Sequence, residues 1–199
     1  MTGQIGNARA RVLVIVSTGV LAALLFVACG GSGRTAAPTT TSSAATTSTT
    51  APLRDVTPTA ADFVNINRMT RVGEHFIASL NGHLEEALAV ARNPRDAVYP
   101  VGTVLQLIPT EAMVKRREGY SPSTGDWEFF SLHVSPTGTE IQSSGAKVKN
   151  FLGADCASCH LPAKAHFDFV CEKAHGCAPL GLPDGLIATI QKGDPRPKS

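Results

Sequence analysis

Five residues near the C-terminal end of the 199-residue chain combine types and spacing suited to chemistry: Cys156-Ala157-Ser158-Cys159-His160. This Cys-x-x-Cys-His order is the arrangement of covalent c-type haem attachment. The two thiols add across the haem vinyl groups to give thioethers, and the adjacent histidine is then held where a ring nitrogen can reach the iron. The motif predicts one covalent haem c, attached at Cys156 and Cys159, with His160 as the metal ligand.

The same residues are compatible with other kinds of site. A structural zinc ion needs four ligands, and Cys171, His175 and Cys177 could complete a set begun by the motif. A thioredoxin-like redox pair requires a βαβ context, which the sequence does not suggest. A structural disulfide followed by a chance histidine is the third possibility. A haem-free zinc-binding or disulfide-stabilised protein therefore stays open as an alternative.

The number of cysteines favours haem, because every thiol then has a role. The chain has five cysteines. If Cys156 and Cys159 carry haem and Cys29 carries lipid, Cys171 and Cys177 remain as a pair, and a disulfide between them would close a small loop at modest entropic benefit. We expect His175, which lies inside this loop, to be exposed.

The N-terminus has the pattern of an export signal, with a basic start, an apolar run from Val12 to Ala28, and then Cys29. The run is also about as long as a minimal membrane span, so a retained anchor is the alternative. Phe26-Val27-Ala28-Cys29 resembles the lipobox of bacterial lipoproteins. This resemblance implies a signal peptide over residues 1–28, acylation of Cys29, and an exported lipoprotein of the cell membrane that faces the periplasm or the cell exterior.

Composition divides the rest of the chain. Residues 29–61 hold the lipidated cysteine and a Ser/Thr/Ala-rich stretch too poor in large apolar side chains to fold, so we expect a disordered linker. The folded domain is predicted over residues 62–180, and residues 181–199 are predicted to be a flexible tail. The formal charge is +2, and both excess positives lie within residues 1–28, so no basic field remains for nucleic acid.

The folded part begins with an apolar period of threes and fours. It predicts one long amphipathic helix, or two helices broken near Gly73 or Gly82, ending at Asn93-Pro94. His75 and His83 fall inside it, and we expect both to be surface or capping histidines. The apolar positions are Phe63, Ile66, Val72, Phe76, Ile77, Leu80, Leu84 and Leu88.

Short strands separated by Pro/Gly-containing turns are predicted next, over residues 101–108, 112–118, 126–134 and 139–149. Strands that follow a helical region, rather than alternating with helices, give an α+β fold. We therefore predict a small antiparallel β-sheet with an N-terminal amphipathic helical region and a C-terminal c-type haem-attachment helix.

From about Tyr99 to Val170 the chain resembles the cytochrome P-460 family, which includes the beta-type cytochromes c-prime. The resemblance implies a largely antiparallel sheet with flanking helices, a proximal histidine at His160 and an open distal face reached by gases. Homodimers are common in that family. The matching pieces are Tyr99-Pro100-Val101-Gly102-Thr103-Val104, Asp126-Trp127-Glu128-Phe129-Phe130, Asp155 to His160, Ala163-Lys164 and Asp168-Phe169-Val170.

The resemblance also implies which reaction is absent. Members that oxidise hydroxylamine carry a lysine, cross-linked to the porphyrin, three positions after the valine of the glycine-threonine-valine strand. Leu107 stands there, and an aliphatic side chain cannot form the nitrogen bridge. Hydroxylamine oxidation is therefore disfavoured. The next lysine, Lys115, is expected to be a solvated charge on an edge strand.

Period two places Thr103 and Leu105 on the same face as Leu107, where they could line an apolar distal pocket. Trp127 and Phe129 are further candidates for packing against haem. A five-coordinate iron on an apolar side would bind small diatomics such as nitric oxide or carbon monoxide, for sensing, sequestration or slow redox conversion of nitrogen oxides. The alternative is an electron-transfer cytochrome with a redox partner, in which Met113, Met69, His133 or His166 fills the sixth position.

Overall fold

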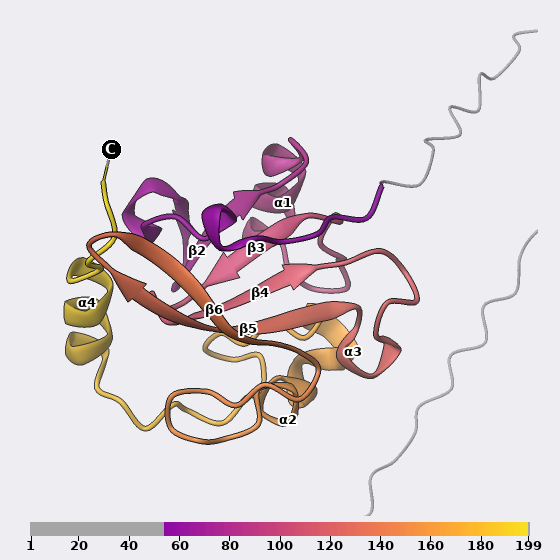
Figure 1. The fold of residues 1–199 in the computed structure, drawn as a ribbon. Coiled ribbons are helices and arrows are strands. Elements are labelled where there is room, and N and C mark those ends of the chain that lie inside the picture. The colour runs from indigo at the N-terminus through magenta and orange to yellow at the C-terminus, as the bar shows by residue number, and fades with distance from the viewer. Residues whose placement is uncertain (1–53, 199) are drawn as a thin grey trace, which may run out of the picture. The chain divides into compact units, whose positions relative to one another are not determined.

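The structure is a computed structural model that describes residues 54–198. Cys29, the predicted signal peptide and most of the predicted linker lie outside these residues. Within residues 54–198, six strands form one antiparallel sheet in the order of the sequence (Figure 1). The strands are β1 (Thr70–Val72), β2 (His75–Ser79), β3 (Thr103–Gln106), β4 (Glu111–Lys115), β5 (Trp127–Ser135) and β6 (Gly138–Gly145).

The helical segments of this part of the chain are short. The 3-10 segments are η1 (Ala60–Asp62), η2 (Ile66–Arg68), η3 (Pro122–Thr124) and η4 (Leu161–Ala163). The α-helices are α1 (Leu84–Arg92), α2 (Cys156–His160), α3 (Lys164–Phe167) and α4 (Asp184–Lys192). The predicted mixed α+β class with a small antiparallel sheet is confirmed.

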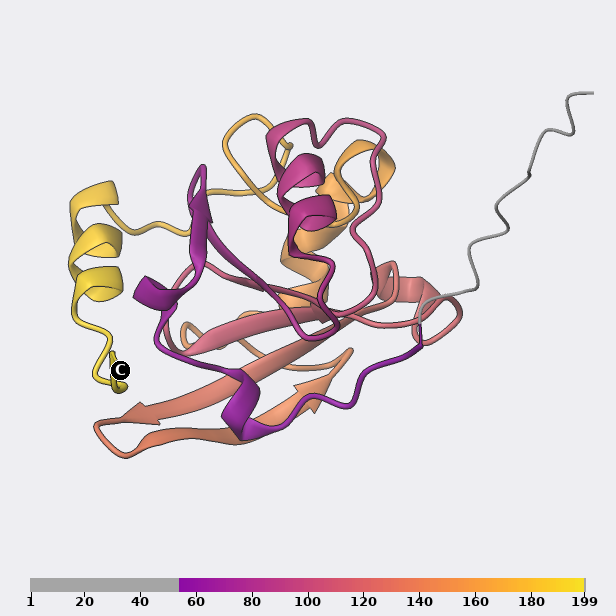
Figure 2. The ribbon, with the colours of Figure 1, turned by 90° about the horizontal axis from the view of Figure 1, so that it is seen from above.

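The alternation of side chains along the strands gives the sheet two apolar faces. On one face, Leu105 pairs with Ile77 on one side and with Met113 on the other, and α1, α2 and α3 cover this face (Figure 2). On the other face, Phe130 and Val114 pack with Phe63 from the N-terminal segment. We call the face covered by α1 to α3 the helical face, and the functional residues discussed below lie on it.

The four strands predicted after Tyr99 are confirmed, but the prediction of helix over residues 63–80 is wrong. That segment forms η1, η2, β1 and β2, and helix begins only at Leu84. Val72 pairs with His75 across a tight turn in which Gly73 has φ +59°, a conformation that glycine adopts without strain. Apolar residues spaced at threes and fours also fit a strand whose two faces are both buried, and here tertiary pairing decided between the two periods.

The segment after Leu180 also differs from the prediction of a flexible tail. It contains α4, which lies at one end of the sheet, away from α1 to α3 (Figure 1). Asn67 donates to the Gln191 carbonyl at 3.0 Å, and the backbone N–H of Ile66 donates to the Asp194 carboxylate at 2.8 Å. The helix has an apolar period at Leu186, Ile187 and Ile190, but the polar contacts that dock it join segments far apart in the sequence.

Among residues 54–198, no helix has both the length and the apolar character needed to cross a membrane.

Candidate functional site

A cavity of about 390 Å³ lies on the helical face of the sheet, against the chain that follows Asn150. Its volume falls within the range of about 300–1,000 Å³ typical of small-molecule and cofactor sites. The predicted site residues in its wall are Cys156, Cys159, His160, Leu105, Leu107, Met113 and Phe129. The cavity thus brings the motif and most of the predicted distal residues together.

Helix α2 presents the motif to this cavity. Asp155 caps the helix by accepting a hydrogen bond from the Ser158 N–H at 2.8 Å, which also holds the pKa of its carboxyl below the usual range. Residues three and four apart share one face of a helix, so Cys156, Cys159 and His160 project together. Neither cysteine of the motif is in a disulfide, and burial raises the pKa of the Cys156 thiol to about 12. A buried thiol of this kind is a poor redox nucleophile, which argues against a thioredoxin-like role.

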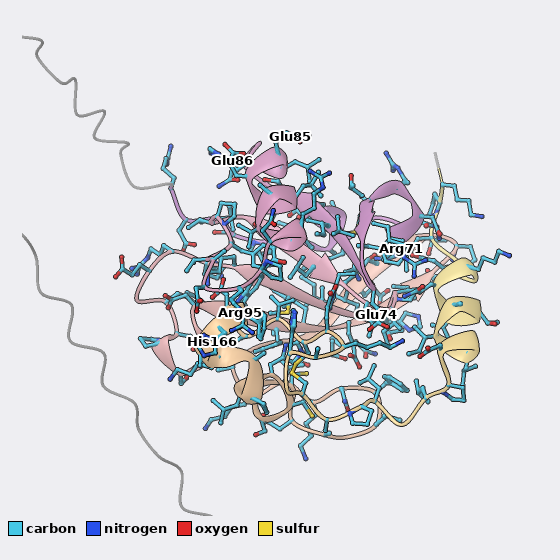
Figure 3. The ribbon with its side chains drawn as sticks, turned by 180° about the vertical axis from the view of Figure 1, so that it is seen from behind. Arg71, Glu74, Glu85, Glu86, Arg95 and His166 are labelled. Atoms are coloured by element: carbon cyan, nitrogen blue, oxygen red, sulfur yellow. A yellow bond between two sulfur atoms is a disulfide. The ribbon has the colours of Figure 1, made fainter. Side chains whose placement is uncertain are left out.

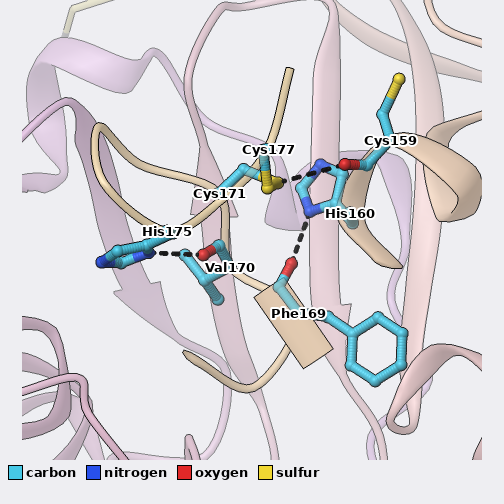
Figure 4. The surroundings of a disulfide bond; sticks show 7 residues. All are labelled: Cys159, His160, Phe169, Val170, Cys171, His175 and Cys177. Carbon is cyan, nitrogen blue, oxygen red and sulfur yellow. Dashed lines mark hydrogen bonds between the residues drawn. A yellow bond between two sulfur atoms is a disulfide. The ribbon is translucent and has the colours of Figure 1, made fainter. Parts of the chain in front are cut away.

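The ring of His160 is oriented for ligation. Its Nδ1 lies 2.6 Å from the carbonyl oxygen of Phe169, so Nδ1 carries the proton and donates it to that carbonyl (Figure 4). Burial lowers the pKa of His160 to about 4, although the bond to Phe169 opposes the shift. The ring is therefore neutral at pH 7, with the lone pair on Nε2. Metal-ligating histidines generally donate their other ring N–H to a carbonyl or carboxylate in this way.

A strained turn supplies the carbonyl that binds His160. Asp168 and Phe169 both have positive φ, +47° and +63°, which is uncommon for residues other than glycine. Three groups hold Asp168: the Lys115 ammonium at 2.6 Å, the Tyr99 N–H at 2.9 Å and, on its carbonyl, the Trp127 indole N–H at 2.6 Å. Tyr99, Trp127 and Asp168, which are far apart in the sequence, thus meet in one turn that orients the histidine.

Lys115 corrects a prediction, because it is not a solvated edge charge. Strand β4 lies inside the sheet, and the Lys115 side chain is 7% exposed where it pairs with Asp168. Glu128 is also buried and pairs with Arg116. Trp127 is a fully buried core residue in edge contact with Tyr99, and it is not among the residues that line the cavity.

The disulfide between Cys171 and Cys177 is confirmed (Figure 4). The bond removes both thiolates from a zinc site, and residues 54–198 contain no group of three or more His, Cys, Asp or Glu side chains placed to hold a metal ion. His175 is buried rather than exposed: it stacks on Phe167 at 3.7 Å and its Nδ1 lies 2.7 Å from the Val170 carbonyl. The Cys171 disulfide sulfur also lies 3.5 Å from the Cys159 carbonyl oxygen, so the loop packs directly on the motif.

The sequence did not predict His75 and Glu172 as cavity residues. His75 is buried at the start of β2, lines the cavity, and has its Nδ1 2.9 Å from the Glu172 carboxylate. His83, by contrast, occupies the N-cap position of α1 as predicted. His75 was missed because it was placed in a helix, and because Glu172 is 97 residues away in the sequence.

Of the four side chains proposed for a sixth iron ligand, Met113 alone is among the residues that line the cavity in the described part of the chain. His133 is exposed, and His166 lies on the surface, where it contacts Asp96 at 2.7 Å. Figure 3 shows His166 and Arg95 together at the outside of the fold. Met69 packs against the opposite face of the sheet.

The buried, neutral His160 gives a pH prediction for the chain without haem. An unfolded histidine takes up a proton below about pH 6.5, whereas folded His160 does so only near pH 4. The unfolded state therefore binds more protons between these values, and stability falls as pH drops through this window, by about 3 kcal/mol. Urea unfolding at pH 7 and pH 4 measures this loss. Between pH 7 and pH 4, the free energy of unfolding of His160→Gln should fall by about 3 kcal/mol less than that of the unaltered protein. An equal fall in both proteins would show that His160 is not the group responsible.

Comparisons with known protein families, with curated proteins and with solved structures found no match to this chain.

Proposed function

We propose that this chain is an exported, lipid-anchored monohaem c-type cytochrome of the cytochrome P-460-like type. In this proposal α2 is the haem-attachment helix, with thioether bonds at Cys156 and Cys159 and with His160 Nε2 as the iron ligand. Haem would supply an iron centre that binds small gases. Acylated Cys29 would anchor the protein to the membrane, and the chain between Cys29 and the start of the folded domain would act as the tether.

The observation that carries the proposal is the state of His160. Its Nδ1–H is bonded to the Phe169 carbonyl, its ring is neutral, and it lines a cavity together with both motif cysteines. Such an outer hydrogen bond fixes the tautomer and orientation of a histidine before it meets a metal. A chance histidine after a structural disulfide has no need of this arrangement, and Cys156 and Cys159 form no such disulfide.

The apolar groups of the cavity support a gas as the ligand. Leu105, Leu107 and Phe129 line it. Phe129 lies edge-on to the His160 ring, with 5.2 Å between the ring centres. An apolar site without a strong second ligand leaves the iron free to bind nitric oxide or carbon monoxide. Leucine at position 107 also leaves no amine for the porphyrin cross-link, so hydroxylamine oxidation is not proposed.

Electron transfer is the second candidate, because Met113 lines the same cavity. Met113 pairs with Leu105 and with Phe129 on the neighbouring strands, and it therefore shares the helical face with them. A thioether bound to iron would give a six-coordinate, low-spin haem that excludes gases.

The test is the absorption spectrum of the ferrous protein, made with haem-maturation machinery, before and after addition of nitric oxide. We expect a broad high-spin spectrum that shifts on addition. Sharp low-spin bands that do not shift when nitric oxide is added would favour electron transfer. In that case Met113→Leu should restore gas binding. Absence of haem absorbance would overturn both candidates.

Covalent attachment has its own control. After denaturation, haem should remain attached to the unaltered protein and to the Cys171→Ser/Cys177→Ser variant. It should be extractable from the Cys156→Ser/Cys159→Ser variant, which lacks both thioether bonds. The Cys171→Ser/Cys177→Ser variant removes two cysteines of the same chain that are already joined to each other.

A further inference from the structure

The His75–Glu172 pair is built more firmly than a surface contact. His75 is 6% exposed, and Glu172 accepts from its Nδ1 at 2.9 Å and from the Glu74 backbone N–H at 3.3 Å. Gly73 makes room for this carboxylate, since a Cβ at position 73 would lie 2.5 Å from Glu172 Oε1. The β1–β2 turn therefore binds and positions the Glu172 carboxylate.

This contact fixes which nitrogen of His75 is basic. The hydrogen bond from His75 holds the pKa of Glu172 below its usual range, although burial opposes the shift. An ionised carboxylate only accepts hydrogen bonds, so Nδ1 of His75 carries the proton and Nε2 holds the lone pair. A carboxylate behind an imidazole also stabilises the ring when it takes a second proton.

His75 enters the cavity from strand β2 and Glu172 from the segment that follows α3, whereas His160 enters it from α2. The pairing of Phe76 with Gln106, continued by one residue, brings His75 next to Leu107, and both line the cavity. The other charged groups there are engaged: Lys173 contacts Glu74 at 3.2 Å and Asp184 at 2.9 Å, and Glu111 accepts from the Phe151 N–H at 2.8 Å. Figure 3 shows Glu74 at the end of the sheet that faces α4.

We propose that His75 is the proton acceptor of this cavity for ligands that arrive as small weak acids, H–X, and bind as the anion X⁻. Hydrogen cyanide, hydrazoic acid and hydrogen peroxide belong to this class. The H–X bond breaks, its proton passes to His75 Nε2, the electron pair stays on X, and no electron is gained or lost. Glu172 balances the charge of the resulting imidazolium. The inference rests on the proposed function and extends its ligands beyond neutral diatomics.

The experiment compares two probes on the haem-loaded protein. Cyanide association with the ferric protein requires loss of a proton from hydrogen cyanide, whereas carbon monoxide association with the ferrous protein requires none. His75→Leu should slow cyanide association by about 100-fold, the lower end of general-base effects, whereas carbon monoxide association, which transfers no proton, should change far less. Glu172→Gln keeps the shape of the site and should slow cyanide by roughly tenfold.

His83→Leu is the matched control. His83 also has its Nδ1 near a glutamate, Glu86, at 3.2 Å, but it lies at the start of α1 and is not among the cavity residues. Both rates should match the unaltered protein.

Four results would overturn the inference. Unchanged cyanide rates in His75→Leu and Glu172→Gln, or equal slowing of cyanide and carbon monoxide, would remove the role as proton acceptor. A haem that changes from low spin to high spin in His75→Leu would make His75 an iron ligand instead. A chain that takes up no haem overturns the proposed function and this inference with it, whereas a loaded protein with unchanged rates overturns the inference alone.

Discussion

Replacing Asp168 by asparagine should lower the free energy of unfolding by about 3–5 kcal/mol, the usual cost of removing one partner of a buried ion pair. The Lys115 and Asp168 side chains are 7% and 8% exposed, and the ammonium lies 2.6 and 2.8 Å from the two carboxylate oxygens. Asparagine leaves the buried ammonium without its counter-charge. Because a small domain is stable by only about 5–15 kcal/mol in total, urea unfolding should show the loss clearly.

Lys173→Met provides the matched control. Lys173 also pairs with two carboxylates, but its side chain is 72% exposed, and water replaces such contacts at little cost. Lys115→Met should be as damaging as Asp168→Asn, and the double variant should lose less than the two single losses added together, because the partners act on each other. Additive losses, or a loss in Lys173→Met equal to that in Lys115→Met, would show that the ion pair is not the cause.

This ion pair affects the functional site because Asp168 holds the turn whose next residue binds His160. The following residue, Phe169, supplies the carbonyl that binds His160 Nδ1, and Gly125 allows the Phe169 ring to pack at this turn, where a Cβ would meet the ring at 2.5 Å. A backbone with two successive positive φ values persists only when its surroundings hold it there. In haem-loaded Asp168→Asn we therefore also expect a weakened iron–histidine bond, which resonance Raman spectroscopy measures.

The sequence predicted the parts of the site that depend on local spacing. The Cys156–His160 motif forms a single helical turn, which its own residues determine through the Asp155 cap. Period two grouped Leu105 with Leu107, which both line the cavity, but Thr103, which it placed on the same face, is not among the lining residues. The turns between predicted strands also hold, because proline fixes φ, while glycine and aspartate tolerate the left-handed backbone conformations that turns require.

The parts that the sequence did not predict depend on contacts between distant segments. The apolar spacing before Leu84 fits a helix as well as a strand buried on both faces, and the pairing of β2 with β1 and β3 makes it a strand. The error hid His75, whose partner Glu172 lies far along the chain. Likewise, no local pattern shows that Lys115 meets Asp168 inside the fold. Lysine is seldom buried without a partner, and this partner lies far along the chain, so the sequence predicted an exposed side chain.

The C-terminal segment is fixed by a second buried ion pair, and breaking it should free α4. Asp194 and Arg196 side chains are 0% and 1% exposed and lie 2.7 Å apart. Although burial opposes it, the contact with Arg196 holds the pKa of Asp194 below its usual range. Asn65 binds the carbonyls of both residues, and Arg196 in turn donates to the Phe63 carbonyl at 2.9 Å. The pair thus ties the end of the chain to the start of the folded domain.

Arg196→Met should therefore cost about 3–5 kcal/mol in the docking of α4 and increase amide hydrogen exchange over residues 184–196. The consequence reaches the cavity, because Ile187 of α4 lines it and Gln191 donates to the Leu107 carbonyl at 2.9 Å. Carbon monoxide should bind the haem-loaded variant faster, since this wall opens more often. Lys192→Met removes an exposed charge from the same helix and should change neither measurement. Faster exchange without faster binding would show that gases enter elsewhere, and unchanged exchange would show that α4 is held by its other contacts.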